Sequence, residues 1–310
     1  MDNKVIVIAG ATASGKTSLS IKIAQKYDGE VVSADSMQIY KGMNIATAKP
    51  SKEEMCGIPH HLMDFLSPEE TFSVSQYVDM AKEKINDILS HGKVPVVCGG
   101  TGLYIRSLVE NVRFSPHDPN EKLRDELNAR YEKEGGEVLL KELAEFDEET
   151  AKTLHPSNNK RIIRAIEIYK TTGRTMSEHI RDSKNTPSPY DWTVIGLTFA
   201  DRQKLYDRID LRVDVMLEMG LLDEAREFYR EHKGKTAAGA IGYKELKPYL
   251  DGEMSLDEAV ERLKQVTRNY AKRQMTWFKK DEYINWIYAD KCRDVFEEAE
   301  KILSCRFTNG

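Results

Sequence analysis

Residues 10–17 read Gly-Ala-Thr-Ala-Ser-Gly-Lys-Thr and match the pattern G-x-x-x-x-G-K-[ST] of a phosphate-binding loop, or P-loop. The apolar run at 5–9 before it predicts a strand buried on both faces of a parallel sheet, and residues 16–27 after it predict a helix. A P-loop needs this order of strand, loop and helix. The motif therefore indicates an α/β fold that binds phosphate.

Strands and helices continue to alternate after the loop. Residues 30–34 and 94–98 predict two more apolar strands, and Ser73 to Ser90 has the spacing of an amphipathic helix between them. Alternation of this kind is typical of a doubly wound parallel sheet, which gathers ligands outside the carboxyl ends of its strands. We therefore expect an α/β protein built on a P-loop doubly wound parallel sheet.

The pattern changes after Phe114. Helices with acidic faces are predicted from about 119 to 150, a basic helix follows at 158–172, and residues 193–198 predict a return to the sheet. We expect residues 1–113 and 192–310 to form the P-loop core with C-terminal helices, and residues 114–191 to form a mainly helical insertion domain. The rest of the chain after this return is expected to be helical, with 256–280 as the longest helix.

The composition restricts the class of protein. The 310 residues are 40% apolar, enough for a substantial core, and the N-terminal apolar run is too short for a signal peptide or a membrane span. Four cysteines without C-x-x-C spacing argue against a zinc site or a disulfide framework. We therefore expect a cytoplasmic protein with reduced thiols and no membrane partner.

The net charge of −5 conceals an uneven distribution of charge. Residues 118–150 hold 12 acidic and 5 basic residues, whereas residues 262–280 hold 7 basic and no acidic residues. In this basic segment Arg268, Lys272 and Lys279 can share one side of a helix, beside Arg273 and the aromatic residues Tyr270, Trp277 and Phe278. Such a mixture suits a phosphate backbone with unstacked bases. The alternative is that the aromatic rings lie in the core and the basic face meets solvent.

Polar residues follow two of the predicted strands. Asp35 comes directly after strand 30–34, where its carboxylate can serve a metal or an incoming nucleophile, or simply cap the next segment. Gln38 is within reach of a base edge through its amide. Thr101 follows two glycines after strand 94–98 and can approach the same phosphates, although such glycines more often form a simple turn. We interpret the adjacent His60 and His61 as structural, because neighbouring residues of an extended segment point in opposite directions.

The P-loop itself predicts the ligand chemistry. Its backbone N–H groups converge on phosphate oxygens, Lys16 adds a positive charge, and the Thr17 hydroxyl can bind Mg²⁺ as the metal ligand. The residues expected to bind a diphosphate are Gly10, Ala11, Thr12, Ala13, Ser14, Gly15, Lys16 and Thr17.

Six segments together resemble the tRNA dimethylallyltransferase family, also called tRNA isopentenyltransferases, in its compact bacterial form. The segments are GATASGKT at 10–17, SADSMQIYKGMNIATAKP at 33–50, GGTGLY at 99–104, HPSNNKRIIRAIE at 155–167, AIGYKEL at 240–246 and RNYAKRQMTWF at 268–278. The resemblance implies transfer of a dimethylallyl group from dimethylallyl diphosphate to N6 of adenosine 37, in tRNAs that read codons beginning with U. The products are N6-(dimethylallyl)adenosine and diphosphate.

The same resemblance assigns roles to residues. Asp35 is the general base on N6, and Lys16, Thr101 and Arg208 are the other catalytic residues. The partners are the tRNA anticodon stem-loop and dimethylallyl diphosphate, with Mg²⁺ as cofactor and no obligatory protein partner. The insertion domain is expected to contact the tRNA. Because no second strand-end carboxylate is found for a metal, we also expect ATP to bind the P-loop weakly at most and to stay intact. The residues expected to contact tRNA are Asp35, Ser36, Met37, Gln38, Thr101, Arg124, Lys160, Arg161, Arg164, Arg268, Lys272 and Arg273.

Two other functions share part of this pattern. A nucleoside or small-metabolite kinase has the same loop and sheet, but strand 94–98 ends in glycines where such an enzyme carries a second carboxylate for its metal. An RNA-binding module without catalysis leaves Lys16 and Thr17 with no task. Both alternatives are less favoured than prenyl transfer.

Overall fold

A computed structural model of the protein describes residues 3–112, 114, 120–184, 186–231, 234 and 236–307. The chain divides into two compact units. The core unit comprises Met1–Leu108 and Pro189–Gly310, and the insertion unit comprises Val109–Ser188. The division falls at 108/109 and 188/189, where the sequence analysis placed it at 113/114 and 191/192.

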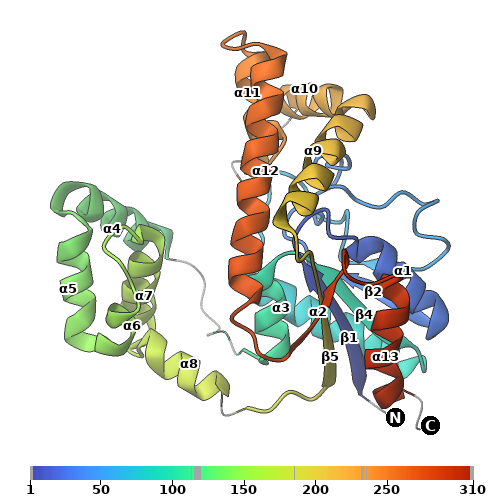
Figure 1. Ribbon diagram of the computed structural model, residues 1–310. Coiled ribbons are helices and arrows are strands. Elements are labelled where there is room, and N and C mark those ends of the chain that lie inside the picture. The colour runs from blue at the N-terminus through green and yellow to red at the C-terminus, as the bar shows by residue number, and fades with distance from the viewer. Residues whose placement is uncertain are drawn as a thin grey trace. The chain divides into compact units, whose positions relative to one another are not determined.

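The core unit contains a six-stranded sheet in which every pairing is parallel, as expected for this α/β fold. The strand order is β3-β2-β4-β1-β5-β6, so β1, the strand before the P-loop, lies inside the sheet (Figure 1). Its residues Val5 to Ala9 are fully buried. The strands are β1 (Lys4–Gly10), β2 (Gly29–Ser33), β3 (His60–His61), β4 (Val94–Gly99), β5 (Asp191–Thr198) and β6 (Ile284–Tyr288).

Helices cover both faces of the sheet. On one face, α1 (Lys16–Lys26) and α13 (Val295–Phe307) pack Leu19, Ile23 and Leu303 against the apolar side chains of the central strands. The opposite face is covered by α2 (Val74–Ser90) and α3 (Gly102–Val109), whose Tyr77 and Tyr104 rings stack with centroids 4.1 Å apart (Figure 1). The doubly wound arrangement predicted from the alternating pattern is thus confirmed.

The C-terminal helices of the core unit build a second apolar core. They are α9 (Arg202–Glu218), α10 (Leu221–Glu231), the short 3₁₀ helix η1 (Ala237–Gly239), α11 (Tyr243–Leu250) and α12 (Leu256–Phe278). Their buried side chains enclose Ile39, Tyr40 and Met43, which belong to the irregular segment after β2. This packing holds the segment after Asp35 against α9–α12. In the part of the chain that is described, no helix has the length and apolar character to cross a membrane.

The expectation that the rest of the chain after 193–198 is helical was wrong. Ile284–Tyr288 forms the edge strand β6, which pairs with β5. This strand has only five residues, and its buried Ile284 and Ile287 are three positions apart, so it lacks the alternation that predicts a strand. The two-residue strand β3 forms the other edge of the sheet and pairs with β2. Its His61 Nε2 lies 2.7 Å from a carboxylate oxygen of Glu30 in β2.

The insertion unit is helical. It contains α4 (Glu121–Glu134), α5 (Gly136–Phe146), α6 (Glu148–Lys152), α7 (Asn159–Thr172) and α8 (Met176–Lys184). Their apolar faces meet in a core that includes Leu127, Leu139, Leu143, Ile162 and Ile166. The acidic residues of α4 and α5 lie mostly on the outer faces.

One carboxylate inside the insertion unit holds two helices together. Glu167 of α7 is fully buried and accepts ion-paired hydrogen bonds from Arg124 Nε at 2.9 Å and Arg164 Nη1 at 2.8 Å, and one from the Asn120 backbone N–H at 3.0 Å. Burial alone would raise the pKa of Glu167, but these hydrogen bonds outweigh it and hold the pKa below its ordinary value. Two arginines predicted to contact tRNA therefore have a structural partner.

We expect Glu167→Gln to destabilise the packing of α4 against α7 by about 2 kcal/mol, because two charge-assisted hydrogen bonds are lost. The pKa of Glu167 is depressed in the folded protein. The stability that its carboxylate provides is therefore complete above about pH 4.3, the ordinary pKa of a glutamate, and is lost as the pH falls through the folded pKa. Hydrogen exchange of the α4 amides between pH 7 and pH 3 measures this. Glu148→Gln, which removes an exposed pair with Lys152, is the matched control and should cost less than about 0.5 kcal/mol.

Candidate active site

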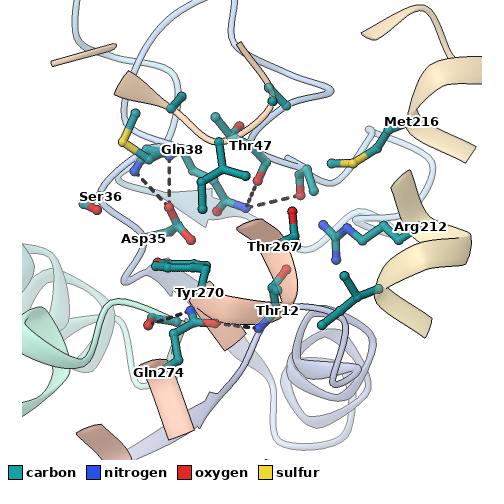
Figure 2. A pocket seen from close by; sticks show the side chains of 18 of the residues that line it. Thr12, Asp35, Ser36, Gln38, Thr47, Arg212, Met216, Thr267, Tyr270 and Gln274 are labelled. Atoms are coloured by element: carbon teal, nitrogen blue, oxygen red, sulfur yellow. Dashed lines mark hydrogen bonds between the residues drawn. The ribbon is translucent and has the colours of Figure 1, made fainter. Parts of the chain in front are cut away.

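Three neighbouring strands end at one edge of the sheet. β1 leads into the P-loop, β2 leads into Asp35, and β4 leads into Gly100 and Thr101. The Thr101 backbone N–H donates to the Ala34 carbonyl at 3.2 Å, which ties the ends of β2 and β4 together. A pocket of about 400 Å³ opens here, and its polar lining includes Thr12, Lys16, Thr17, Asp35, Ser36, Arg212 and Arg273 (Figure 2). The strand ends that were expected to meet do so in the core unit.

The P-loop has the backbone conformation that its glycines permit. Gly10 has a φ of 149° and lies so close to β5 that a Cβ there would be 2.5 Å from the Leu197 carbonyl oxygen. Gly15 has a φ of 98° and precedes α1, which begins without a side-chain cap. The first N–H groups of α1 are therefore available to an anion, supported by the helix dipole.

Lys16 extends from the first turn of α1, and its Nζ donates to the Ala11 carbonyl at 2.6 Å. The pKa of Lys16 is lowered to about 8, mainly by burial and in smaller part by the Arg212 cation, while Cys98 and Asp35 act in the opposite direction. A cation whose charge is disfavoured by burial and by a second cation is stabilised when an anion binds beside it.

Arg212 is a site residue that sequence analysis missed. It lines the pocket from α9, and among the described residues no hydrogen bond or ion pair satisfies its guanidinium. Burial lowers its pKa, yet a guanidinium stays charged. Arg208, one helical turn earlier, donates from Nε to the Ala13 carbonyl of the P-loop at 2.9 Å. The spacing of four residues from Arg208 was the only signal for Arg212 in the sequence.

Asp35 both caps a turn and faces the pocket. Its Oδ1 accepts from the backbone N–H groups of Met37 at 2.9 Å and Gln38 at 3.3 Å (Figure 2). No hydrogen bond from a described residue reaches Oδ2. The cap therefore uses one oxygen of the carboxylate and leaves the other available to accept a proton.

Thr101 and Ser36 form a pair beside Asp35. Thr101 Oγ1 accepts from the Ser36 backbone N–H at 3.0 Å and donates to Ser36 Oγ at 3.3 Å. Since Thr101 precedes α3 and Ser36 follows Asp35, this pair fixes the distance between the ends of β4 and β2.

The amide of Gln38 is already used inside the protein. Its Nε2 donates to the Thr47 and Ala48 carbonyls, both at 3.2 Å, and its Oε1 accepts from Ser33 Oγ at 3.0 Å. Both N–H bonds of the side chain thus serve the loop. The interpretation that this amide reads a base edge finds no support in this geometry, and a structural role fits the contacts better.

The basic segment of α12 contains residues of two kinds. Phe278 is fully buried, and Trp277 packs under Gly102 with the Arg106 guanidinium 4.9 Å from its ring, so the core alternative is right for these two rings. Tyr270 instead lines the pocket, with the Arg273 guanidinium 5.7 Å from its ring.

Gln274, also of α12, is a second site residue that sequence analysis missed. Its Oε1 accepts from the Thr12 N–H and its Nε2 donates to the Gly100 carbonyl, both at 2.9 Å. These two bonds fix the P-loop to the end of β4 (Figure 2).

The cations predicted to bind tRNA also differ in their partners. Arg268 Nη1 lies 2.5 and 2.7 Å from the two oxygens of Asp210, so a phosphate would compete with that carboxylate. Lys272 and Arg273 in the core unit, and Lys160 and Arg161 in the insertion unit, are exposed and form no ion pair with any described residue. These four keep their charge available.

Comparisons with known proteins agree on one family. The model of the IPP transferase family matches residues 38–281. A tRNA dimethylallyltransferase of Acetivibrio thermocellus is 50% identical over 305 residues, which cover 98% of this chain and 96% of that protein. One from Thermoanaerobacter pseudethanolicus is 44% identical over 301 residues, covering 96% of this chain and 95% of the relative.

Solved structures agree with the sequence relatives. The crystal structure of the full-length tRNA isopentenylpyrophosphate transferase from Bacillus halodurans has a TM-score of 0.71 at 42% identity and covers 97% of this chain and 94% of that one. The structure of a eukaryotic dimethylallyltransferase acting on tRNA has a TM-score of 0.83 at 34% identity and covers 98% of this chain and 79% of that one.

The unpaired cation in the pocket leads to a prediction. Arg212→Gln should weaken the binding of inorganic diphosphate by roughly 10- to 100-fold, because a charge-assisted contact is lost, and should leave the free energy of unfolding unchanged or raise it. Titration calorimetry and urea unfolding measure the two effects. Arg202→Gln, an exposed arginine on the same helix, is the control for net charge. Equal weakening in both variants would remove Arg212 from the site.

Proposed function

This chain belongs to the tRNA dimethylallyltransferases, enzymes that prenylate adenosine 37 of tRNA, and we propose that its P-loop and Asp35 hold the two reacting groups of that transfer in one pocket. The observation that carries the proposal is the convergence of a P-loop, a strand-end carboxylate with a free oxygen and an unpaired arginine. A phosphate site alone fits many enzymes, whereas a phosphate site beside a proton acceptor fits nucleophilic substitution on a diphosphate ester.

In this proposal the diphosphate of dimethylallyl diphosphate lies on the P-loop. The free N–H groups at the start of α1, the Lys16 ammonium and the Arg212 guanidinium surround it, and Arg208 supports the loop from behind through the Ala13 carbonyl. As the bond from the allylic carbon to oxygen breaks, the diphosphate takes the electron pair and gains negative charge. Cations already fixed in place stabilise that charge more strongly than mobile water does.

Magnesium fits this site as a cofactor. The Thr17 hydroxyl lies in the first, exposed turn of α1, where it would hold the ion against the diphosphate. Among the described residues no three His, Cys, Asp or Glu side chains gather, and Mg²⁺ bound mainly by phosphate oxygens and waters needs no such cluster. When bound, the ion neutralises charge on the leaving diphosphate.

Asp35 is the proton acceptor in this reaction. The exocyclic N6 amine of adenine is a weak nucleophile, because its lone pair is conjugated with the ring. As N6 forms its bond to the allylic carbon, it becomes positively charged, and Asp35 Oδ2 takes the proton. The anticodon loop stacks its bases, so the adenine has to be flipped out to reach this carboxylate.

The apolar part of the pocket protects the reacting carbon. Ile209, Val213 and Met216 of α9 and Leu263 of α12 line it. Figure 2 shows Met216 across the pocket from Asp35. Water would compete with N6 for an allylic carbon that carries partial positive charge, so an apolar wall favours transfer to tRNA over hydrolysis.

A phosphate-transferring function is the weaker candidate. Transfer of the γ-phosphate of ATP needs a metal held by a second strand-end acid, but β4 ends at Gly99 and is followed by Gly100. We therefore propose that ATP competes with dimethylallyl diphosphate and stays intact.

Cations in each unit are proposed to bind the tRNA backbone. Lys272 and Arg273 in the core unit and Lys160 and Arg161 in the insertion unit are exposed and without an ion-pair partner among the described residues. Phosphate contacts of this kind set affinity and orientation, whereas the reaction at N6 depends on the pocket.

Asp35→Asn should lower the rate of prenyl transfer by roughly 10²- to 10⁴-fold and leave tRNA affinity within a few fold, because asparagine still caps the turn with Oδ1 but accepts no proton. The measurement is incorporation of labelled dimethylallyl into an anticodon stem-loop RNA, with an RNA lacking adenosine 37 as the blank. Asp35→Ala removes the cap as well and should be slower still. Turnover near the native rate in Asp35→Asn would leave Asp35 with the capping role alone.

Replacement of both Lys272 and Arg273 by glutamine should reduce the magnitude of the slope of log affinity against log salt for tRNA by roughly 0.7–0.9 per residue. The reason is that fewer counterions leave the tRNA on binding when a phosphate contact is lost. Arg268→Gln should change this slope less, since Asp210 already neutralises Arg268. Binding of inorganic diphosphate should stay unchanged in the double variant. An unchanged salt slope would mean that this face of α12 meets only solvent.

A further inference from the structure

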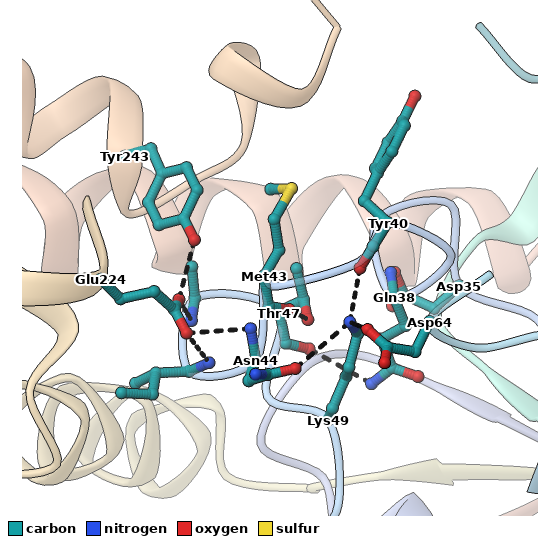
Figure 3. Close-up of polar contacts among 12 residues, drawn as sticks. Asp35, Gln38, Tyr40, Met43, Asn44, Thr47, Lys49, Asp64, Glu224 and Tyr243 are labelled. Atoms are coloured by element: carbon teal, nitrogen blue, oxygen red, sulfur yellow. Dashed lines mark hydrogen bonds and ion pairs between the residues drawn. The ribbon is translucent and has the colours of Figure 1, made fainter. Parts of the chain in front are cut away.

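The segment from Asp35 to Lys49 forms one wall of the pocket without regular secondary structure. Besides turn hydrogen bonds within the backbone, three polar side chains, Gln38, Lys49 and Glu224, satisfy several of its backbone groups (Figure 3). Lys49 Nζ lies 2.5 Å from the Tyr40 carbonyl and 2.6 Å from Asp64 Oδ1. Gln38 and Lys49 belong to the segment, whereas Glu224 comes from α10, far along the chain.

Glu224 occupies a nest of three successive backbone N–H groups. Its Oε2 accepts from Asn44 at 2.9 Å and Ile45 at 2.7 Å, and its Oε1 accepts from Ala46 at 2.9 Å. Successive N–H groups that converge in this way form an anion-binding concavity. Here the protein's own carboxylate fills it.

The same carboxylate also contacts a neighbouring part of the pocket lining. Glu224 Oε1 also accepts from the Tyr243 hydroxyl at 2.9 Å, and Tyr243 follows Gly242, which lines the pocket. Burial and the Glu224 charge raise the pKa of Tyr243, so the hydroxyl remains a donor. The segment AIGYKEL at 240–246, which the reaction itself does not use, thus joins the wall that holds Asp35.

A series of hydrogen bonds, linked by the covalent bonds of residues 46–48 and of Gln38, leads from Glu224 to Asp35. Glu224 fixes the turn at 44–46, the next two carbonyls, of Thr47 and Ala48, accept from the Gln38 amide, and the Gln38 backbone N–H donates to Asp35 Oδ1. We propose that Glu224 is a positioning residue that acts through Gln38 to aim the free oxygen of Asp35 at the N6 amine. This inference rests on the proposed role of Asp35 as the base.

The substitution Glu224→Gln tests this positioning role most directly. It keeps the size of the side chain but places an NH₂ group against N–H donors that need an acceptor, so at least one bond to the nest turns repulsive. The residues that hold the diphosphate lie on the P-loop and α9, which the series does not include. Their function should therefore remain.

The first experiment compares Glu224→Gln with Asp223→Asn, which changes an exposed neighbouring acid by the same charge. We expect Glu224→Gln to lower kcat for prenyl transfer by roughly 10- to 100-fold, as misplacement by about an ångström does. Its Kd for inorganic diphosphate should stay within about twofold of the native value. Amide exchange of peptides covering 41–49 should accelerate by at least about tenfold. Asp223→Asn should change none of these quantities.

A second experiment tests the route through Gln38. Because both side chains act in one series, Gln38→Leu combined with Glu224→Gln should lose about as much kcat as the worse single variant. Losses that multiply would overturn the series, and so would native kcat in Glu224→Gln. If Glu224→Gln does not fold, Tyr243→Phe and Gln38→Leu carry the same comparison, and native kcat in both overturns the proposal.

Asp35→Asn, measured in parallel, separates the two proposals. Native turnover in that variant refutes Asp35 as the base, and it also refutes the proposal that Glu224 orients Asp35 for that role. An impaired Asp35→Asn beside a fully active Glu224→Gln refutes the positioning role alone.

Discussion

The parallel pairing of β1, β4 and β2 is the constraint on which the site depends. Ala9 is in register with Gly99, and Ser33 with Cys98, so the three strands end at the same level. One or two residues further along each strand lie the P-loop, Thr101 and Asp35. A Cβ at Gly99 would lie 2.1 Å from the Ala34 carbonyl oxygen, so the close approach of these strand ends requires glycine. Antiparallel pairing would put the phosphate site and the acid at opposite ends of the sheet.

Whether a cation has a carboxylate partner distinguishes cations with a structural role from cations that can bind a ligand. Arg124, Arg164 and Arg268 are half-buried and each meets a carboxylate, which satisfies the desolvated charge. Arg212 and Lys16 are desolvated near each other, and neither forms an ion pair within the described chain. An arrangement that costs stability and gains nothing in the free protein is expected where a ligand supplies the missing charge. From the sequence, Arg124, Arg164 and Arg268 were expected to bind tRNA and Arg212 was missed, because a partner distant along the chain has no local signature.

The sequence was therefore most informative about short-range features. The P-loop, the strand ends with Asp35 and Thr101, and most helices follow from local pattern, and the family resemblance extended them over nearly the whole chain. Contacts between distant segments were beyond its reach. Gln274 meets the P-loop 262 residues away in sequence, and Glu224 meets Ala46 across 178 residues. The strand β6 was missed for a related reason, since only its pairing with β5 makes five mixed residues a strand.

The core unit contains two concave groups of backbone N–H donors, and they are used in opposite ways. Glu224 fills the nest at 44–46 and so ties the wall that holds Asp35 to α10 without any substrate. The start of α1 has no side-chain cap, and although α11 of the same unit also lacks one, α1 follows the P-loop and its first residues, Lys16 and Thr17, line the pocket. An anion from outside is needed to satisfy the open site, and an anion from within already satisfies the closed one. In the proposed mechanism, with Asp35 as the base, an internal anion holds the base in place. Binding of the diphosphate then does not have to organise it, and the binding free energy remains available to stabilise the charge that develops as the diphosphate leaves.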